Sequence, residues 1–172
     1  MNAKPRVVVI GVGLIGASIG SALTQQSWTV HLRDARLSHA RVAETLGAGS
    51  VAPPVAGDVD LVVVAVPPRA LAGVVHSALD SYPNATVTDV GSVKAEVLDT
   101  LWGHRDLHRY VGSHPMAGTQ HSGPTAARAD LFADRTWVIT PHRRSDPSAI
   151  ADVTRLAEAC GARTVIMDVD EH

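Results

Sequence analysis

The sequence predicts an α/β fold with a doubly wound, mostly parallel sheet, and three observations support this. Apolar, β-branched runs alternate with helix-like stretches along most of the 172 residues, which is typical of a parallel sheet covered on both faces. A glycine-rich turn follows the first run and opens the first helix, as in folds of the Rossmann type. Apolar residues make up 45% of the chain and charged residues 19%, a globular composition that fits one compact domain.

The strands are expected where apolar residues fill both faces of a short run. The first, 6–10, is apolar almost throughout and is broken by the glycine-rich turn, and the third stops at Pro67-Pro68. The expected strands are 6–10, 29–33, 61–66, 85–89, 136–140 and 163–167, with a short strand-like run at 110–112.

Helices are expected between these strands, at 14–26, 38–46, 69–79, 93–101 and 147–159. Small residues at Gly16, Ala17 and Gly20 let the first helix pack closely on the sheet. Gly47 and Gly161 end the second and the last helix. Residues 113–134 are too irregular for one element, and loops of this length are usually functional or disordered.

Charge and residue counts argue against several classes of protein. The chain has 15 Lys and Arg against 17 Asp and Glu, a formal charge of −2 with no basic stripe, which argues against nucleic-acid binding. The single cysteine, Cys160, excludes a disulfide framework and is expected to be a small apolar residue near a helix end. No H-x-x-H or H-E-x-x-H spacing is present, so we expect no metal site. The longest apolar run is too short to span a membrane and no signal peptide is recognisable, so the expected location is the cytoplasm.

The glycine-rich turn Gly11-Val12-Gly13-Leu14-Ile15-Gly16 fits the G-x-G-x-x-G pattern in its expected context, between a strand and a helix. We expect Gly11 to permit the tight turn and Gly13 to let the backbone approach a pyrophosphate. Gly16 would allow the helix and the strand to pack closely. The pyrophosphate would lie at the helix N-terminus, beside Leu14 and Ile15, where N–H groups and the helix dipole favour an anion. The alternative is a glycine-rich turn without a ligand.

Two further positions belong to the same predicted cofactor site. Asp34 ends the second strand, where a carboxylate can accept hydrogen bonds from ribose hydroxyls and would repel a 2′-phosphate, so NAD is expected rather than NADP. Arg33 and Arg36 flank it and would suit a 2′-phosphate, and a solvated turn aspartate is the alternative. Val66 and Pro67 follow the third strand, next to the expected cofactor crevice, although they can equally be a simple strand stop.

The candidates for chemistry lie in two segments, 88–94 and 112–119, which we expect at the same edge of the sheet. Ser92 opens a helix, so its simplest role is an N-cap. His114 lies between a strand and a proline, and an imidazole near the cofactor can act as a general base. Lys94 can be a substrate contact, but a solvated helix lysine is favoured. Four other histidines are expected at the surface: His104, His108, His121 and His142.

Together these segments resemble the prephenate/arogenate dehydrogenase family. The matching runs are 11–18, 88–94 and 112–119, and 170–172 resembles the start of the family's next conserved stretch. The resemblance covers essentially the whole chain, and it implies a dinucleotide-binding domain at 1–168. Residues 169–172 would begin a helical domain that is absent from this chain and that, in the family, supplies a substrate-binding arginine and most of the dimer interface.

The resemblance also implies a reaction, the NAD-dependent oxidative decarboxylation of prephenate to 4-hydroxyphenylpyruvate in tyrosine biosynthesis. His114 would polarise the ring hydroxyl as the hydride leaves, and Ser92 would bond the same hydroxyl and help to place the nicotinamide. Thr119 and Gln120 match positions near the substrate's side chain, and His172 a position near the active site. Gln120 is neutral, which favours prephenate over arogenate, because an acidic residue there would pair with the amino group of arogenate.

Three readings stay open at this point. The first is a dehydrogenase of this family, whose substrate can be arogenate instead of prephenate. The chain can also belong to another two-domain NAD(P) reductase, such as a β-hydroxyacid dehydrogenase or an imine reductase, which shares the glycine turn. A non-catalytic dinucleotide-sensing module is the third reading. Under the first, the complete enzyme is expected to be a homodimer, and this chain alone to bind NAD with little or no turnover.

Overall fold

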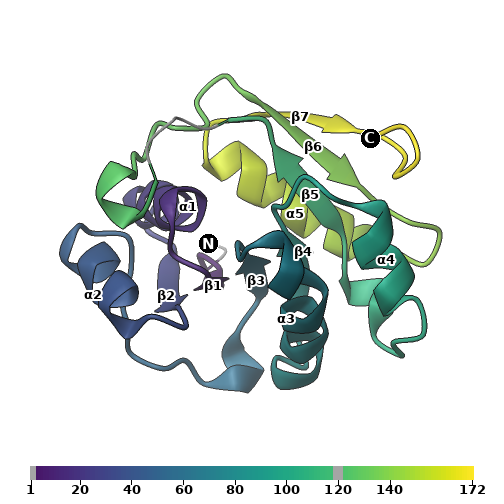
Figure 1. Cartoon of the computed structure of the whole chain (residues 1–172), viewed down its shortest axis with the longest axis horizontal. Coiled ribbons are helices and arrows are strands. Elements are labelled where there is room, and N and C mark those ends of the chain that lie inside the picture. The colour runs from purple at the N-terminus through teal and green to yellow at the C-terminus, as the bar shows by residue number, and fades with distance from the viewer. Residues whose placement is uncertain (1–2, 118–121) are drawn as a thin grey trace.

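The computed structural model describes residues 3–117 and 122–172, and its strands form two sheets (Figure 1). The first sheet has the order β2-β1-β3-β4 and is parallel throughout. The second has the order β5-β6-β7, in which β5 and β6 are antiparallel and β6 and β7 are parallel. The strand bounds are β1 (Arg6–Ile10), β2 (Thr29–Arg33), β3 (Leu61–Val64), β4 (Thr86–Asp89), β5 (Gly112–Pro115), β6 (Thr136–Thr140) and β7 (Arg163–Ile166).

The two sheets meet between β4 and the residues that lead into β5. Val87 and Tyr110 form a parallel bridge, and the N–H of Val111 donates to the carbonyl of Val87 at 3.0 Å. Because this register is parallel, its continuation places Gly112 opposite Asp89, the last residue of β4. The carboxyl end of β5 therefore lies at the same edge as the carboxyl ends of β1, β3 and β4.

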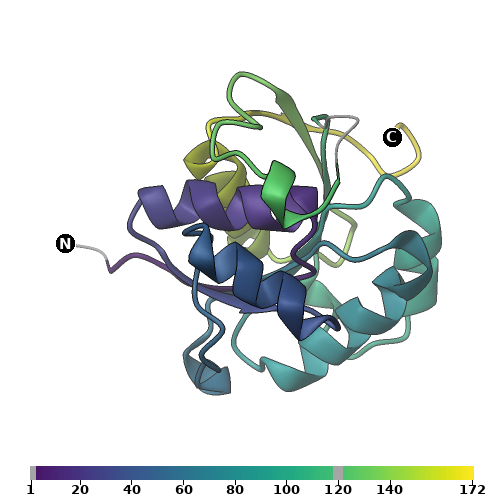
Figure 2. The ribbon, with the colours of Figure 1, turned by 60° about the vertical axis from the view of Figure 1, so that its left-hand side comes forward.

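Helices cover both faces of the sheet (Figures 1 and 2). Val7 and Val9 of β1 belong to the core packed under α1, α2 and α5, whereas Val8 belongs to the core under α3 and α4. This alternation explains why the strands are apolar on both faces. The helix bounds are α1 (Leu14–Gln25), α2 (Leu37–Thr45), α3 (Pro68–Ser81), α4 (Ala95–Leu101) and α5 (Pro147–Ala159), with short 3₁₀ turns at Ala56–Asp58, Leu107–Arg109 and Pro124–Ala126.

The predicted α/β class is confirmed, and the helices and six strands lie within two residues of their expected bounds. The exception is β5, expected at 110–112 but found at Gly112–Pro115, so that all but its first residue fall in the stretch predicted to be irregular. Gly112–Pro115 contains no β-branched residue, so its strand conformation depends on pairing with β6 rather than on local preference.

Two other expectations from the sequence concern Cys160 and membrane-spanning helices. Cys160 is 3% exposed at the end of α5, and burial raises the pKa of its thiol to about 12, as expected for an inert, apolar cysteine. Within the described residues, no helix has the length and apolar character needed to cross a bilayer.

Candidate functional site

Two of the three motif glycines are required by the packing of the protein itself. Gly11 follows β1 with a φ of +93°, a backbone conformation that favours glycine, and a Cβ there would lie 2.3 Å from the carbonyl oxygen of Ala65. A Cβ on Gly16 would lie 1.8 Å from the carbonyl oxygen of Gly11. A side chain at position 11 would push the glycine turn away from the end of β3. A side chain at position 16 would push α1 away from the turn.

Gly13 is different, because nothing in the protein requires glycine there. Its φ is −71°, which any residue adopts, and a Cβ would meet no atom within 4 Å. It is the N-cap of α1, whose first turn carries neither a side-chain cap nor an acidic residue. The open space thus lies at a helix N-terminus whose N–H groups suit an anion, beside the half-buried Leu14 and Ile15. A pyrophosphate fits both the space and the donors.

Asp34 is held against the glycine turn rather than solvated. Its Oδ2 accepts the N–H of Val12 and its Oδ1 accepts the N–H of Arg36, both at 2.8 Å. Each carboxylate oxygen can accept a second hydrogen bond, so ribose hydroxyls can still be bound.

The segment after β3 also lies against the glycine turn. Gly11 is close enough to the backbone of Ala65 and Val66 that a Cβ would touch both. Pro67 is the N-cap of α3 and Pro68 its first residue, a position where the missing N–H costs nothing. The prolines therefore do end the strand, and Val66 and Pro67 border the turn as well.

A buried ion pair links the two segments that carry the candidates for chemistry. Asp89 and Lys94 are 0% and 3% exposed, and the Lys94 ammonium donates to Asp89 Oδ2. Lys94 also donates to the carbonyl of Ser113 at 2.7 Å, and the hydroxyl of Ser113 donates to the carbonyl of Asp89 at 2.9 Å. The expectation of a solvated Lys94 was therefore wrong. The residue that could have indicated the burial of Lys94 is Asp89, since a carboxylate at the end of a buried strand needs a positive partner.

The surroundings of this pair shift two pKa values. Burial lowers the pKa of Lys94, although the neighbouring Asp89 opposes this. Tyr110 donates its hydroxyl to Asp89 Oδ1 at 2.6 Å, and its pKa is raised well above the usual range, first by burial and then by the negative charge of Asp89. Asp89 thus has a donor on each of its two oxygens.

Ser92 lies at the surface, in the turn between β4 and α4. Helix α4 begins at Ala95 and its N-cap position is Lys94, so the prediction that Ser92 is the N-cap of this helix is wrong. The preceding residue, Gly91, donates its N–H to Asp89 Oδ2 at 3.0 Å, which fixes the turn to the ion pair.

His114 lies in β5 opposite Val138 and is half-buried. Continuing the register between Val87 and Tyr110 places it level with Gly91, past the end of β4. The structure therefore brings the Ser92 turn and His114 to one edge of the sheet, as expected. Burial lowers the pKa of the His114 imidazole, and the positive charges of His172 and Lys94 lower it further, whereas Asp89 raises it.

His172 joins this site from the far end of the chain. Its Nε2 lies 3.0 Å from His114 Nδ1, and the two rings meet edge to face with centroids 5.1 Å apart. Thr119 and Gln120, expected near the substrate's side chain, lie outside the described residues, as does His121.

Two of the histidines expected at the surface are partly or largely buried. The side chain of His104 is only 5% exposed, between α4 and the following turn. His142 is half-buried and donates its Nε2–H to the carbonyl of Tyr110 at 2.8 Å. Burial is the main cause that lowers the pKa of His142. Both positions depend on contacts with distant segments, which their polar sequence neighbours do not reveal.

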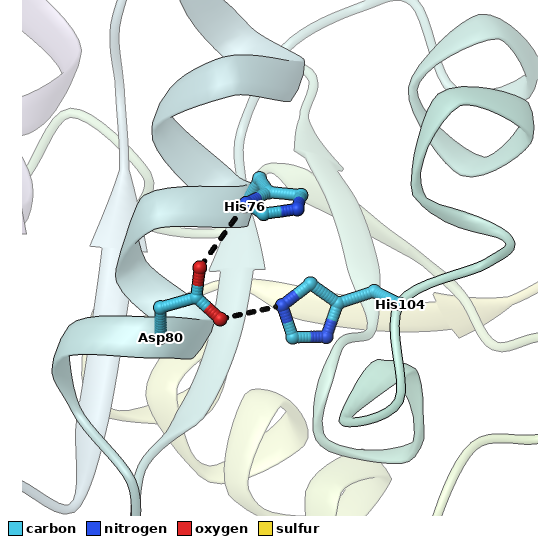
Figure 3. A group of neighbouring side chains, drawn as sticks. All are labelled: His76, Asp80 and His104. Atoms are coloured by element: carbon cyan, nitrogen blue, oxygen red, sulfur yellow. Dashed lines mark hydrogen bonds and ion pairs between the residues drawn. The ribbon is translucent and has the colours of Figure 1, made fainter.

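His104 also belongs to the one group of three metal-ligating side chains that comes together within the described residues, with His76 and Asp80 (Figure 3). Asp80 lies 3.3 Å from His76 and 2.9 Å from His104 Nε2. The Nδ1 of His104 accepts the N–H of Asp106 at 3.0 Å, so in the neutral ring Nε2 carries the proton and donates it to Asp80. A metal ion would need that same nitrogen without its proton. The geometry therefore favours a hydrogen-bonded tie between α3 and residue 104, and the absence of a metal site stays a prediction.

This fold and this edge of the sheet define a dinucleotide-binding domain. The glycine turn, the N-terminus of α1 and the acidic residue after β2 occupy the places that such domains give them, outside the carboxyl ends of parallel strands.

The chain belongs to the family described as prephenate dehydrogenase, nucleotide-binding domain, whose family model matches residues 19–166. It is 41% identical over 168 residues to a probable prephenate dehydrogenase from Streptomyces niveus, covering 96% of this chain and 46% of that protein. It is 34% identical over 180 residues to a cyclohexadienyl dehydrogenase from Zymomonas mobilis, covering 100% of this chain and 61% of that protein. The resemblance inferred from the motifs is confirmed.

Solved structures agree with this assignment. The chain superposes with a TM-score of 0.86 and 26% identity on the prephenate dehydrogenase from A. aeolicus in complex with hydroxyphenyl propionate and NAD+, covering 99% of this chain and 62% of that one. The chain thus spans between 46% and 62% of the length of these three relatives.

Proposed function

We propose that this chain is the NAD-binding part of a dehydrogenase that oxidises prephenate with loss of CO2 to give 4-hydroxyphenylpyruvate. The observation that carries the proposal is the meeting of the Ser92 turn and His114 at the edge of the sheet next to the glycine turn. The names of the relatives support the same reaction class. In this proposal residues 1–168 are the dinucleotide-binding domain and 169–172 begin the next domain.

The cofactor site is formed by the glycine turn and its neighbours. Gly13 and the N-terminus of α1 would hold the pyrophosphate, and Asp34 would bind the ribose hydroxyls and disfavour the 2′-phosphate of NADP. Val66 and Pro67 border the same crevice. When bound, NAD supplies the acceptor for the hydride.

His114 is the base in this proposal. Its lowered pKa keeps the imidazole neutral at neutral pH, so it can accept the proton of the substrate's ring hydroxyl as the hydride leaves the same carbon. The carboxylate then leaves as CO2, its bonding electrons complete the aromatic ring and turn the ring carbonyl into a phenolate, and the proton held by His114 returns to that oxygen. Because Nδ1 of His114 faces His172, Nε2 is the nitrogen for the substrate. Ser92 bonds the same hydroxyl and helps to place the nicotinamide.

The finer points of the proposal concern substrate and assembly. We favour prephenate over arogenate because Gln120 is neutral, with Thr119 and Gln120 as contacts to the substrate's side chain. The complete enzyme is proposed to be a homodimer, which light scattering on the purified complete protein would test.

The decisive experiment uses the complete gene product and follows NADH formation at 340 nm. Prephenate and arogenate are each supplied with NAD and with NADP, and the matched control is His114→Asn. Turnover with prephenate and NAD that is lost in His114→Asn, with NAD affinity unchanged, is the expected result. If neither substrate is turned over although NAD binds, the proposed reaction is wrong.

A further inference from the structure

The buried pair of Asp89 and Lys94 is not explained by the cofactor site or by the proposed roles of Ser92 and His114. Both side chains are almost fully buried, at 0% and 3% exposure. Removing an ion pair from water costs several kcal/mol per ion, and well-packed apolar residues of similar volume are often as stable. Stability alone is therefore a weak reason for this pair.

The hydrogen bonds of the pair lead to the two segments that bear Ser92 and His114. Asp89 Oδ2 accepts the N–H of Gly91, the residue before Ser92. Lys94 donates to the carbonyl of Ser113, the residue before His114. The pair thus holds the immediate chain neighbour of each candidate group.

The strand β5 also passes closely over the lysine side chain. A Cβ on Gly112 would lie 2.9 Å from Thr140 Oγ1, 3.0 Å from the hydroxyl oxygen of Tyr110 and 3.3 Å from Lys94 Cδ. Glycine at 112 lets β5 lie directly on Lys94, so a change in the lysine side chain is transmitted to the strand that carries His114.

Charge is the second link between the pair and His114. The titratable groups that act on the His114 imidazole are His172, Lys94 and Asp89, and the last two act in opposite directions. The charges are buried, so solvent screens them less than it would at the surface.

We propose that Asp89 and Lys94 are positioning residues, which hold His114 and the Ser92 turn in fixed register and place two opposed charges near the His114 ring. The part of this inference that concerns catalysis rests on the proposed role of His114 as the base. The part that concerns geometry and charge does not, because it can be measured on the chain without turnover.

The test is the NMR titration of the His114 ring in three variants, with His114→Asn used to assign its signal. In Lys94→Met a positive neighbour is lost while Asp89 stays, so the His114 pKa is expected to rise. In Asp89→Asn the negative neighbour is lost, so the pKa is expected to fall. In the double variant, which combines Lys94→Met and Asp89→Asn, the His114 pKa is expected to return toward the wild-type value. Shifts of the same sign in both single variants, or no shift in either, would overturn the inference.

Two controls separate positioning from a merely structural role. Tyr110→Phe removes a hydrogen bond from an uncharged hydroxyl to Asp89 but removes no charge, and it should leave the His114 pKa at its wild-type value within error. Single variants that leave a buried charge unpaired lose about 3–5 kcal/mol of stability and can fail to fold. Lys94→Arg and the double variant keep the charge balance and serve in their place.

In the complete protein, Lys94→Arg and the double variant are expected to bind NAD as the wild type does and to lose kcat at least tenfold. A double variant that folds and keeps the wild-type kcat would refute the inference. If the wild-type protein itself fails to oxidise prephenate, the proposed function is wrong, but the opposed pKa shifts remain a separate result.

Discussion

The replacement of Gly13 by alanine separates ligand binding from protein packing. A Cβ at this position meets no protein atom within 4 Å, and the backbone φ of −71° suits alanine. Gly→Ala at a compatible site stabilises a protein by about 0.4–1 kcal/mol through the unfolded chain. At an N-cap, alanine is less favourable than glycine by about 1 kcal/mol. The two effects oppose each other, so the free energy of unfolding should change by less than about 1 kcal/mol.

NAD affinity should behave quite differently. The new methyl group would occupy the space in which we place the pyrophosphate, so the Kd for NAD should rise at least tenfold, which corresponds to about 1.4 kcal/mol. Gly73→Ala is the matched control, because Gly73 lies exposed in α3 and its Cβ also meets nothing within 4 Å. It should stabilise the protein by about 1 kcal/mol and leave NAD binding unchanged.

Calorimetric titration with NAD and urea unfolding of each variant measure the two quantities. Gly16→Ala completes the series, since its Cβ would lie 1.8 Å from the carbonyl oxygen of Gly11 and should cost about 3 kcal/mol of stability. A Gly13→Ala protein that binds NAD with wild-type affinity would refute the placement of the pyrophosphate. A large loss of stability in Gly13→Ala would refute the claim that the space is open.

Four further predictions follow from the same structure. Asp34→Asn should raise the Kd for NAD and narrow the difference between NAD and NADP, because the carboxylate that repels a 2′-phosphate is gone; an unchanged ratio of the two Kd values would contradict this. Burial lowers the pKa of His114 and His142, so the unfolded state binds more protons below the ordinary histidine pKa of about 6.5, and stability should fall as the pH drops through that value. Urea unfolding at pH 7.5 and 5.5 tests this, and His142→Gln should flatten the dependence. The buried thiol of Cys160 should react with a thiol reagent only after unfolding, and rapid reaction in the native protein would argue against its burial. Zinc should leave the Tm unchanged, because His104 Nε2 carries a proton in its bonded tautomer; a rise in Tm that is lost in His104→Gln would show a metal site.

The part of the fold that sequence predicts well is the part that local patterns determine. Residues 6–10 read as a buried strand because they are apolar on both faces, and the structure gives each face its own core. The glycine pattern predicts a strand–turn–helix because Gly11 adopts a φ of +93° in the turn and Gly16 lies against the carbonyl of Gly11 in the same unit. Local sequence and local packing favour the same structure there, so the sequence alone predicts these elements.

The parts that sequence misses depend on contacts between distant segments. Strand β5 has no β-branched residue and is a strand because β6 pairs with it. Lys94 was predicted to be solvated because four loop residues separate it from Asp89, and the sequence does not reveal that β5 passes over it in the folded protein. His104, which follows α4, hydrogen-bonds Asp80 of α3, a contact between distant segments that its sequence neighbours do not reveal.

The two halves of the site are fixed by different physical means, and this has a consequence for function. The glycine turn is placed by the backbone contacts of Gly11 and Gly16 and by the carboxylate of Asp34, which accepts the N–H of Val12. The neighbours of His114 and Ser92 are instead held by the hydrogen bonds of a separate, buried ion pair, Asp89 and Lys94. Binding of the dinucleotide and positioning of the base are therefore separable properties of one domain. A change that disturbs Asp89 or Lys94 should weaken the chemistry while the cofactor still binds. A change at Gly13 should weaken cofactor binding while the base stays in position.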